Sequence, residues 1–329
     1  MRLHPLINTP TLQAFLTATI IGLTAITVYA GGLQLIAVNI FGDGDPANGI
    51  EDSRQQILGG RRNGESLADQ RMNAGTIVCD GKIRGTAMVV DTREYAPGLE
   101  GVVLASAAHV IYDLDKGKPF KRCKFQLMAF GELRRYQAKI DLKYIKMGGY
   151  DPLEATNGSG FGEGDWVFLY VPRPWQGFDP DESLQATEFA FADLQSFRQA
   201  GGEFRLIAFN ADTSVMSVSR YCNVIESKNG DLGGGAWPGQ LLDDCDSANG
   251  SSGGGIVAVL SGKHYLVGIR NGSHWSEQVF PSKEYPLGPP DGANWDRLSN
   301  TNFARAFDAD LLGALKSFSI SLENYNYLY

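Results

Sequence analysis

The chain has 329 residues, of which 43% are apolar and 20% are charged, so it can bury a large core. Lysine and arginine total 29 against 37 for aspartate and glutamate, which gives a formal net charge of -8. An acidic chain without a basic cluster is a poor candidate for binding nucleic acid or an anionic membrane surface. The composition also excludes disorder, coiled coil and collagen as descriptions of the whole chain.

An apolar segment without charged side chains stands at the N-terminus. After Arg2 no Lys, Arg, Asp or Glu occurs until Asp43. A short basic start followed by an apolar run and compact residues predicts a signal peptide, residues 1–30, that is cleaved after Ala30. The alternative is an uncleaved membrane anchor, because the apolar character continues to Phe41. We therefore expect a secreted or periplasmic protein, or one that is membrane-anchored with its globular part outside the cytoplasm.

Residues 42–71 carry many charges and repeated glycines and contain no aromatic residue. This composition is typical of a linker or a pro-segment. From about residue 72 the pattern changes to short apolar runs, so we place the folded domain at residues 72–329.

Eight runs in this domain have strand length and are rich in β-branched or aromatic residues, with Gly, Asp and Asn between them. They span residues 75–79, 85–91, 101–110, 125–130, 166–171, 204–209, 254–260 and 265–269. This spacing predicts an all-β fold, either an antiparallel barrel or a sandwich. Residues 186–202 and 307–318 have helical patterns, the second with apolar residues along one face.

Four cysteines occur, and an even number in an exported chain suggests two disulfides. They are Cys79, Cys123, Cys222 and Cys245, for which three pairings are formally possible. The chain has no CxxC motif and only four histidines. We therefore expect no metal site and no cofactor.

Residues 250–254 have the form GxSGG, with Ser252 as the serine of the motif. A hydroxyl nucleophile needs a tight, glycine-rich turn that leaves its oxygen exposed. In such a turn the N–H groups of Gly250 and Ser252 can form an oxyanion hole for the charge that develops during acyl transfer. The alternative interpretation is an ordinary Gly/Ser loop.

A serine nucleophile also needs a base and a group that orients the base. His109 follows the apolar run that begins at residue 101, and it is the only histidine between the leader and the GxSGG segment. Asp165 directly precedes another apolar run, which can carry its carboxylate inward, and Glu163 is its local competitor. A histidine after an apolar run is often structural, and an aspartate at a strand start is often a turn residue. Together, however, they give the order His, Asp, Ser, which is that of chymotrypsin and not of subtilisin or the α/β-hydrolases.

These segments resemble those of the trypsin/chymotrypsin-like serine peptidases, and most closely the bacterial branch that includes glutamyl endopeptidases. The segment "ASAAHV" around His109 is similar to the family's TAAH segment, with Ser106 in place of the usual Thr. The segments "GDWVFLYV", "DCDSANGSSGGGIV" and "YLVGIRNG" are similar to those around its Asp, its Ser and the strand that follows. The resemblance covers about residues 72–318. It implies two six-stranded antiparallel β-barrels with a C-terminal helix, and a triad in the cleft between the barrels.

The resemblance also implies the activity, a serine endopeptidase that acts through an acyl-enzyme. Ser252 would attack the peptide carbonyl, His109 would move the proton, and Asp165 would orient His109. We expect a monomer with a protein or peptide substrate. The alternative is a catalytically inactive trypsin-like binding or regulatory module, although such proteins usually lose a member of the triad.

The residue that the enzyme would prefer before the scissile bond, P1, stays open. Asp246 lies six residues before Ser252, where a trypsin-like pocket holds its acidic base. Arg270 stands about where glutamyl endopeptidases place a histidine, and Ser247 and His274 are further candidates for the pocket. The alternative is that Asp246 and Arg270 neutralise each other.

Two further expectations depend on the resemblance. We expect Cys79 to pair with Cys123 and Cys222 with Cys245, because each pair then lies within one of the implied barrels. Ser251 stands where trypsin-type enzymes have the aspartate that receives the new N-terminus. We therefore do not expect trypsin-type zymogen activation.

Overall fold

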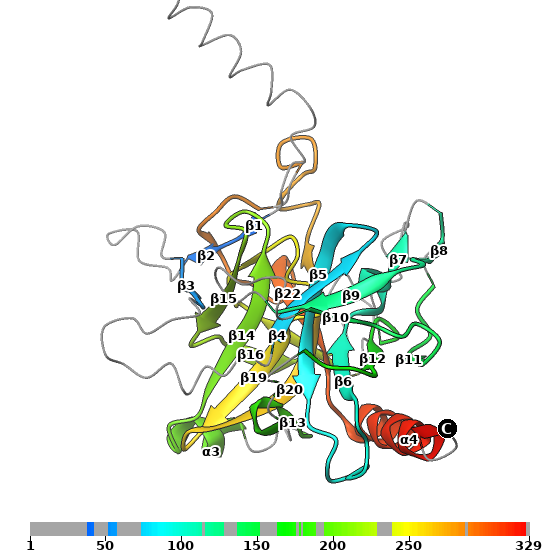
Figure 1. Ribbon diagram of the computed structural model, residues 1–329. Helices are drawn as coiled ribbons and strands as arrows, with labels where there is room; N and C mark the ends of the chain where they lie inside the picture. Colours follow the sequence, from blue (N-terminus) through cyan, green and yellow to red (C-terminus); the bar gives the residue numbers. More distant parts are fainter. Residues whose placement is uncertain are drawn as a thin grey trace, which may run out of the picture. The chain divides into compact units, whose positions relative to one another are not determined.

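Most of the regular secondary structure in the described part of the computed structural model is β-strand (Figure 1). The structure describes residues 38–42, 52–57, 74–113, 116–127, 137–151, 163–175, 178, 180–188, 194–228, 239–286 and 289–326. The expected signal peptide, residues 1–30, lies outside this part, and so does most of the expected linker at residues 42–71. No helix within the described ranges is both long and apolar enough to cross a membrane.

The first sheet has seven strands, all antiparallel to their neighbours, in the order β10-β9-β4-β5-β6-β12-β11. These are β4 (Ala74–Cys79), β5 (Lys82–Val90), β6 (Val102–Ser106), β9 (Cys123–Gln126), β10 (Gln137–Lys139), β11 (Ile145–Met147) and β12 (Val167–Val171). The sheet curls into the first barrel of the fold.

The second sheet has nine strands, in the order β16-β17-β22-β20-β19-β14-β15-β3, with β13 beside β20. Its strands are antiparallel except for the β13–β20 pair. They are β3 (Arg54–Gln56), β13 (Gln185–Ala186), β14 (Glu203–Asn210), β15 (Val215–Arg220), β16 (Val224–Glu226), β17 (Gln240–Asp243), β19 (Gly255–Leu260), β20 (Lys263–Trp275) and β22 (Asn300–Ala306). This sheet forms the second barrel.

Three short strand pairs and four helical segments complete the described part of the chain. The pairs are β1 (Val38–Asn39) with β18 (Ser247–Ala248), β2 (Phe41–Gly42) with β21 (Ala293–Asn294), and β7 (Tyr112–Asp113) with β8 (Lys118–Pro119). The helical segments are the 3₁₀-helices η2 (Ala108–Ile111) and η3 (Pro180–Glu182) and the α-helices α3 (Leu194–Gln199) and α4 (Ala309–Asn326).

The strands near the middle of the fold are buried on both faces, which explains their continuous apolar sequences. Successive side chains of a strand point to opposite faces of the sheet. In β6, Leu104 belongs to the core of the first barrel, whereas its neighbour Val103 belongs to a central core. In β14, Leu206 belongs to the core of the second barrel and Ile207 to the same central core. The two barrels therefore share a hydrophobic layer between them.

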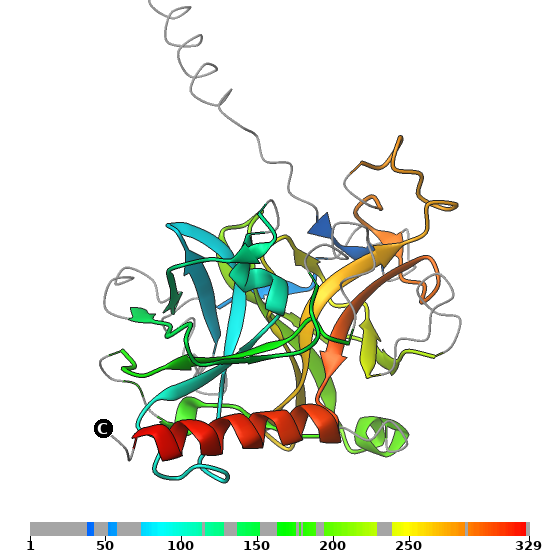
Figure 2. The ribbon, with the colours of Figure 1, turned by 90° about the vertical axis from the view of Figure 1, so that its right-hand side faces the viewer.

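Helix α4 closes one side of this central core (Figure 2). Its apolar stripe is fully buried there and consists of Leu311, Leu315, Phe318 and Leu322. Asp308 caps the helix, because its Oδ1 accepts the N–H of Leu311 at 2.9 Å. The ring of Phe318 stacks on Phe168 of β12 with 6.4 Å between centroids. The C-terminal helix thus binds to both barrels through one core.

The predicted all-β fold with two antiparallel barrels and a C-terminal helix is confirmed. The sheets have seven and nine strands instead of six each, because short strands such as β3 and β13 add to them. Helix α4 continues to Asn326, beyond the predicted end at residue 318, because the apolar stripe extends to Leu322. Of the predicted helix at residues 186–202, the described part contains only α3, and Ala186 belongs to β13.

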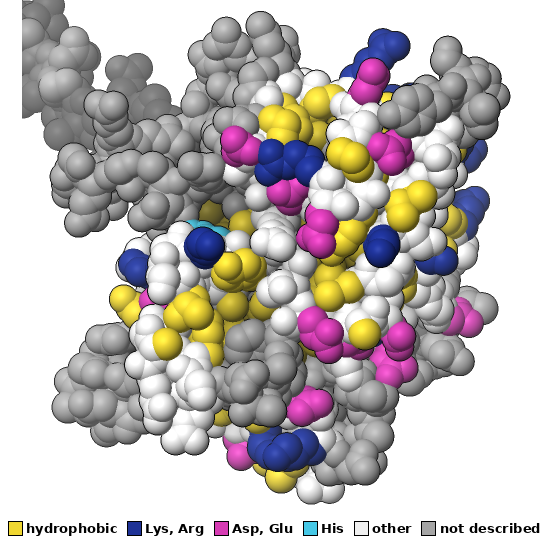
Figure 3. Space-filling model, turned by 90° about the horizontal axis from the view of Figure 1, so that it is seen from below, with side chains coloured by type: hydrophobic (Ala, Val, Ile, Leu, Met, Phe, Trp, Pro, Cys, Tyr) yellow, Lys and Arg dark blue, Asp and Glu magenta, His cyan; other side chains and the backbone are white. Residues whose placement is uncertain are grey.

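The face drawn in Figure 3, which lies at the bottom of Figure 1, carries charged side chains of both signs among apolar and polar ones. Its basic side chains stand singly or in small groups and form no continuous stripe. A stripe or patch of that kind is the usual footprint of nucleic-acid binding.

Candidate active site

His109 and Asp165 lie beyond the same end of two neighbouring strands. Strands β6 and β12 are antiparallel partners, and Ser106 at the end of β6 is opposite Val167 at the start of β12. The chain leaves β6 through the 3₁₀-helix η2, which carries His109, while Asp165 comes two residues before β12 begins. Strand pairing therefore brings together two residues that are 56 positions apart in sequence.

The Asp165 carboxylate binds His109 through both of its oxygens. Oδ1 accepts the backbone N–H of His109 at 2.9 Å, and Oδ2 lies 2.7 Å from its Nδ1. The Asp165 side chain is fully buried, whereas 14% of the His109 side chain is exposed. A carboxylate accepts hydrogen bonds, so this contact suits Nδ1 as the donor and Nε2 as the ring nitrogen that could act as a base.

The GxSGG segment is a tight turn that requires its glycines. Gly250 and Gly253 have φ angles of 94° and 82°, in the left-handed region that residues with a side chain rarely adopt. At Gly253 a Cβ would also lie 2.1 Å from the carbonyl oxygen of Thr86. The Gly253 N–H donates to the Arg270 carbonyl at 2.7 Å, which ties the turn to β20. Ser252 stands within this turn and is partly exposed.

Two N–H groups of the turn make no hydrogen bond within the part of the chain that the structure describes. Among the hydrogen bonds between described residues, neither the N–H of Gly250 nor that of Ser252 is a donor. The neighbouring groups are engaged: Ser251 N–H donates to the Ala248 carbonyl at 3.1 Å and Gly254 N–H to the Ser251 carbonyl at 2.8 Å. Available N–H groups beside a nucleophile are what an oxyanion hole requires.

A cavity of about 310 Å³ brings the proposed nucleophile and base together. Its lining includes both His109 and Ser252, and Asp165 lies behind the imidazole ring of His109. The remaining lining residues are Ser247, Ala248, Asn249, Ser251, Asn271, Gly272, Ser273, Trp275, Asn302 and Phe303. Among the described residues of this lining, His109 is the one with an ionisable side chain.

Thr86 is a further residue of this region, and sequence analysis did not single it out. It is fully buried in β5, where its N–H donates to the Ser252 carbonyl at 2.7 Å and its hydroxyl to the Gly250 carbonyl at 2.8 Å. The same hydroxyl accepts the N–H of Phe209 at 2.9 Å, and the Thr86 carbonyl accepts the Ser106 hydroxyl at 2.7 Å. Thr86 therefore links the first barrel to the nucleophile turn. A threonine within a strand is common, so no sequence signal marks it.

Tyr150 lies near the imidazole of His109 and was also missed by sequence analysis. Its ring centroid is 6.4 Å from that of His109, and it meets Tyr112 edge-on at 5.3 Å. Burial, and then the negative charge of Asp165, raise the pKa of the Tyr150 phenol, so it stays neutral.

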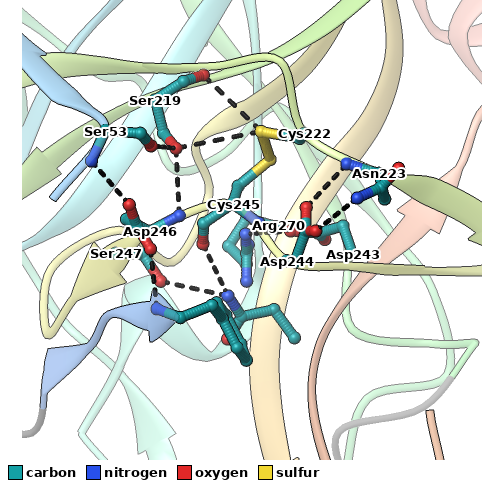
Figure 4. Close-up of a disulfide and its surroundings, with 12 residues drawn as sticks. Ser53, Ser219, Cys222, Asn223, Asp243, Asp244, Cys245, Asp246, Ser247 and Arg270 are labelled. Atoms are coloured by element: carbon teal, nitrogen blue, oxygen red, sulfur yellow. Dashed lines mark hydrogen bonds and ion pairs between the residues drawn. A yellow bond between two sulfur atoms is a disulfide. The ribbon is translucent and has the colours of Figure 1, made fainter. Parts of the chain in front are cut away.

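Both expected disulfides are present. Cys79 of β4 is joined to Cys123 of β9 within the first barrel, and Cys222 is joined to Cys245 within the second (Figure 4). Cys245 stands two residues before Ser247 of the cavity lining. The second bridge therefore braces the chain that leads into the proposed substrate pocket.

The structure places neither Asp246 nor Arg270 in the lining of the cavity, although Ser247 is there. The ion-pair partner of Arg270 is Asp243, not Asp246, with Nη2 and Oδ1 2.7 Å apart (Figure 4). Both side chains of this pair are buried. The sequence alone could not show which of Asp243, Asp244 and Asp246 pairs with Arg270, because the three lie within four positions of each other. His274 also lies outside the lining, and burial lowers its pKa.

Asp243 is therefore a charged residue of this region that sequence analysis missed. Burial raises the pKa of its carboxyl to about 6, although Arg270 and the N–H of Cys245 favour the ionised form. Oδ1 accepts both of these donors, at 2.7 Å and 3.0 Å. Oδ2 has no hydrogen-bond partner within the described part of the chain.

Comparison with known proteins gives structural matches and no sequence match. No protein-family model matches the chain, and no curated protein matches it by sequence. Its structure is similar to that of the thermostable serine protease AL20 from an extremophilic microorganism, with 11% identity and a TM-score of 0.47 over 77% of this chain and 99% of that one. It is also similar to a Glu endopeptidase in complex with MPD, with 10% identity and a TM-score of 0.48 over 82% of this chain and 98% of that one.

Proposed function

We propose that the protein is a serine endopeptidase that uses Ser252, His109 and Asp165. The observation that carries this proposal is the cavity lined by both His109 and Ser252, with the His109 ring held through Nδ1 by the buried Asp165 carboxylate. The N–H groups of Gly250 and Ser252, which donate to no described residue, support it further. These are the nucleophile, base, orienting group and oxyanion donors that acyl transfer requires.

In the proposed reaction the Ser252 oxygen attacks the scissile carbonyl carbon while its proton passes to Nε2 of His109. The N–H groups of Gly250 and Ser252 stabilise the negative oxygen of the tetrahedral intermediate. His109 then gives the proton to the leaving amine, and the acyl group remains on Ser252. A water molecule, deprotonated by His109, releases the acid product and restores the serine. Asp165 holds the ring orientation and stabilises the imidazolium that forms in each step.

We further propose that the protein works outside the cytoplasm. Two disulfides suit an oxidising compartment, where such bonds persist. The apolar N-terminal segment suits export, as a cleaved signal peptide or as a membrane anchor. The substrate would then be an extracellular or periplasmic protein or peptide.

Fluorophosphonate labelling of the wild type, Ser251→Ala and Ser252→Ala tests the proposal. We expect labelling in the wild type and in Ser251→Ala, and none in Ser252→Ala. With a peptide substrate, Ser252→Ala should lower kcat on the order of 10⁶-fold while the fold persists. Labelling of Ser252→Ala would refute the assignment of the nucleophile. A folded wild type that neither labels nor cleaves peptides would favour the inactive binding module.

A further inference from the structure

Two short pieces of chain that precede the first barrel are built into the second one. We call residues 38–42 and 52–57 together the N-terminal strap. Strand β1 pairs with β18, with Asn39 opposite Ser247 and Val38 opposite Ala248. Strand β3 pairs with the edge of β15. The strap thus lies against the strand whose residues Ser247 and Ala248 line the cavity beside Ser252.

Asp246 holds the two pieces of the strap together. Its Oδ1 accepts the N–H of Phe41 at 2.9 Å, and its Oδ2 accepts the N–H of Ser53 at 2.7 Å. Its own N–H donates to the hydroxyl of Ser219, which lies 2.7 Å from the hydroxyl of Ser53 (Figure 4). Asp246 is buried, with 3% of its surface exposed. Each carboxylate oxygen is therefore engaged by the strap and turned away from the cavity.

The position of Asp246 makes this contact relevant to substrate binding. It is the residue directly before Ser247, so any movement of its carboxylate is transmitted to the first residue of the pocket wall. We define the pocket wall as Ser247, Ala248 and Asn249, which all line the cavity. Beyond the wall the chain continues into Gly250, a proposed oxyanion donor.

We infer that Asp246 is a positioning residue whose carboxylate anchors the N-terminal strap and so fixes the pocket wall, and that it is not the counter-charge of a basic P1 side chain. This inference rests on the proposed peptidase function. A buried carboxylate that accepts two backbone N–H bonds is already satisfied, so it has little to offer a substrate cation. By fixing the pocket wall, Asp246 instead affects the binding of every substrate whose P1 side chain contacts that wall.

Kinetics with a peptide series that differs only at P1, from Gly through Leu, Gln and Glu to Lys, tests the inference. Asp246→Asn keeps the shape of the side chain but cannot accept both N–H groups. We expect it to raise KM on the order of 10-fold for peptides with a P1 side chain, whatever its charge, and to change the P1-Gly peptide much less. A selective loss of cleavage after Lys would show that Asp246 is a pocket base and would overturn the inference. Equal losses for all peptides, or no change, would also overturn it.

Ser53→Pro provides a second test that leaves Asp246 intact. Proline removes the N–H that Oδ2 accepts, and Ser53→Ala is the matched reference because both variants lose the hydroxyl. Relative to Ser53→Ala, Ser53→Pro should show the same rise in KM for peptides with a P1 side chain. Identical kinetics of the two variants would contradict the anchor.

Hydrogen exchange separates a failure of this inference from a failure of the proposed function. If the wild type is folded but neither labels nor cleaves, the peptidase proposal fails, and the anchor is judged on exchange alone. Amide exchange at Phe41 and within residues 246–250 should then be faster in Ser53→Pro than in Ser53→Ala. Equal exchange in the two variants would overturn the anchor whatever the activity.

Discussion

At the scale of single residues, Thr86 shows how the first barrel holds a turn that belongs to the second. Its hydroxyl donates to the Gly250 carbonyl and accepts the N–H of Phe209, so it acts both as a hydrogen-bond donor and as an acceptor. The carbonyl of Gly250 belongs to the same turn as the two proposed oxyanion donors. The Thr86 hydroxyl therefore holds the Gly250–Ser251 peptide, which lies between the two peptides that carry those N–H groups.

Thr86→Val tests this role, because valine has nearly the same shape but no hydroxyl. We expect it to leave two buried backbone groups without a partner, at a cost of about 1–3 kcal/mol in the free energy of unfolding. A shifted turn should also lower kcat by roughly 10-fold to 100-fold. Thr86→Ser should restore both values. Urea unfolding and steady-state kinetics measure them, and an unchanged kcat in a folded Thr86→Val would refute the role.

Asp243 makes a prediction about the pH dependence of stability. Burial raises its carboxyl pKa from 3.8 to about 6, so the folded protein holds this proton more tightly than the unfolded chain does. Protonated Asp243 therefore stabilises the folded state below about pH 4. This stabilisation, up to about 3 kcal/mol in the free energy of unfolding, is lost as the pH rises through about 6. Asp243→Asn cannot ionise, so its free energy of unfolding should lack this fall between pH 4 and 6.

Asp308→Asn is the matched control for this prediction. Although burial opposes it, the Arg305 guanidinium and the N–H of Leu311 lower the pKa of Asp308. Ionised Asp308 therefore stabilises the folded state, the reverse of Asp243, and this stabilisation is lost as the pH falls through the lowered pKa of Asp308. Urea unfolding at pH 4, 5, 6 and 7 compares the three proteins. The same slope for the wild type and Asp243→Asn would contradict the prediction.

At the scale of elements, helix α4 stabilises both barrels because its stripe lies in the core that they share. Leu315→Ala should therefore lower the free energy of unfolding by about 2–5 kcal/mol, as large-to-small changes in a core do. Lys316→Ala on the exposed face should change it by less than about 0.5 kcal/mol. Both are measured by urea unfolding. If the free energy of unfolding fell for only one of the two barrels, α4 would not couple them.

The elements also show what the sequence could predict. The strands that end near His109, Asp165 and Ser252 are continuous apolar runs, and such local patterns do not depend on the rest of the chain. The contacts of Asp246 could not be predicted from its local sequence, because its partners Phe41 and Ser53 come from the opposite end of the sequence. Part of the expected linker is strand β3 for the same reason: it pairs with a distant edge that no local pattern reveals.

At the scale of the whole molecule, the two disulfides brace the two barrels separately. Their sequence separations of 44 and 23 residues correspond to roughly 4 and 3 kcal/mol in the chain-entropy model. Replacing either pair by alanine should lower Tm. We expect only the Cys222/Cys245 replacement to raise KM as well, because Cys245 leads into the pocket wall. Calorimetry and kinetics test this, and a larger KM effect from the Cys79/Cys123 replacement would contradict it.

Strand β3 has one more consequence, which concerns how the chain avoids self-association. It pairs with the outer edge of β15, whose middle residues are buried, and among the described strands β3 is the last of the second sheet on this side. A recombinant fragment that begins at residue 72, where composition alone would start the domain, lacks this cover. It would expose a row of unpaired N–H and C=O groups along the edge of β15, which is a template for pairing with another chain. We therefore expect such a fragment to self-associate more readily than a chain that keeps β3.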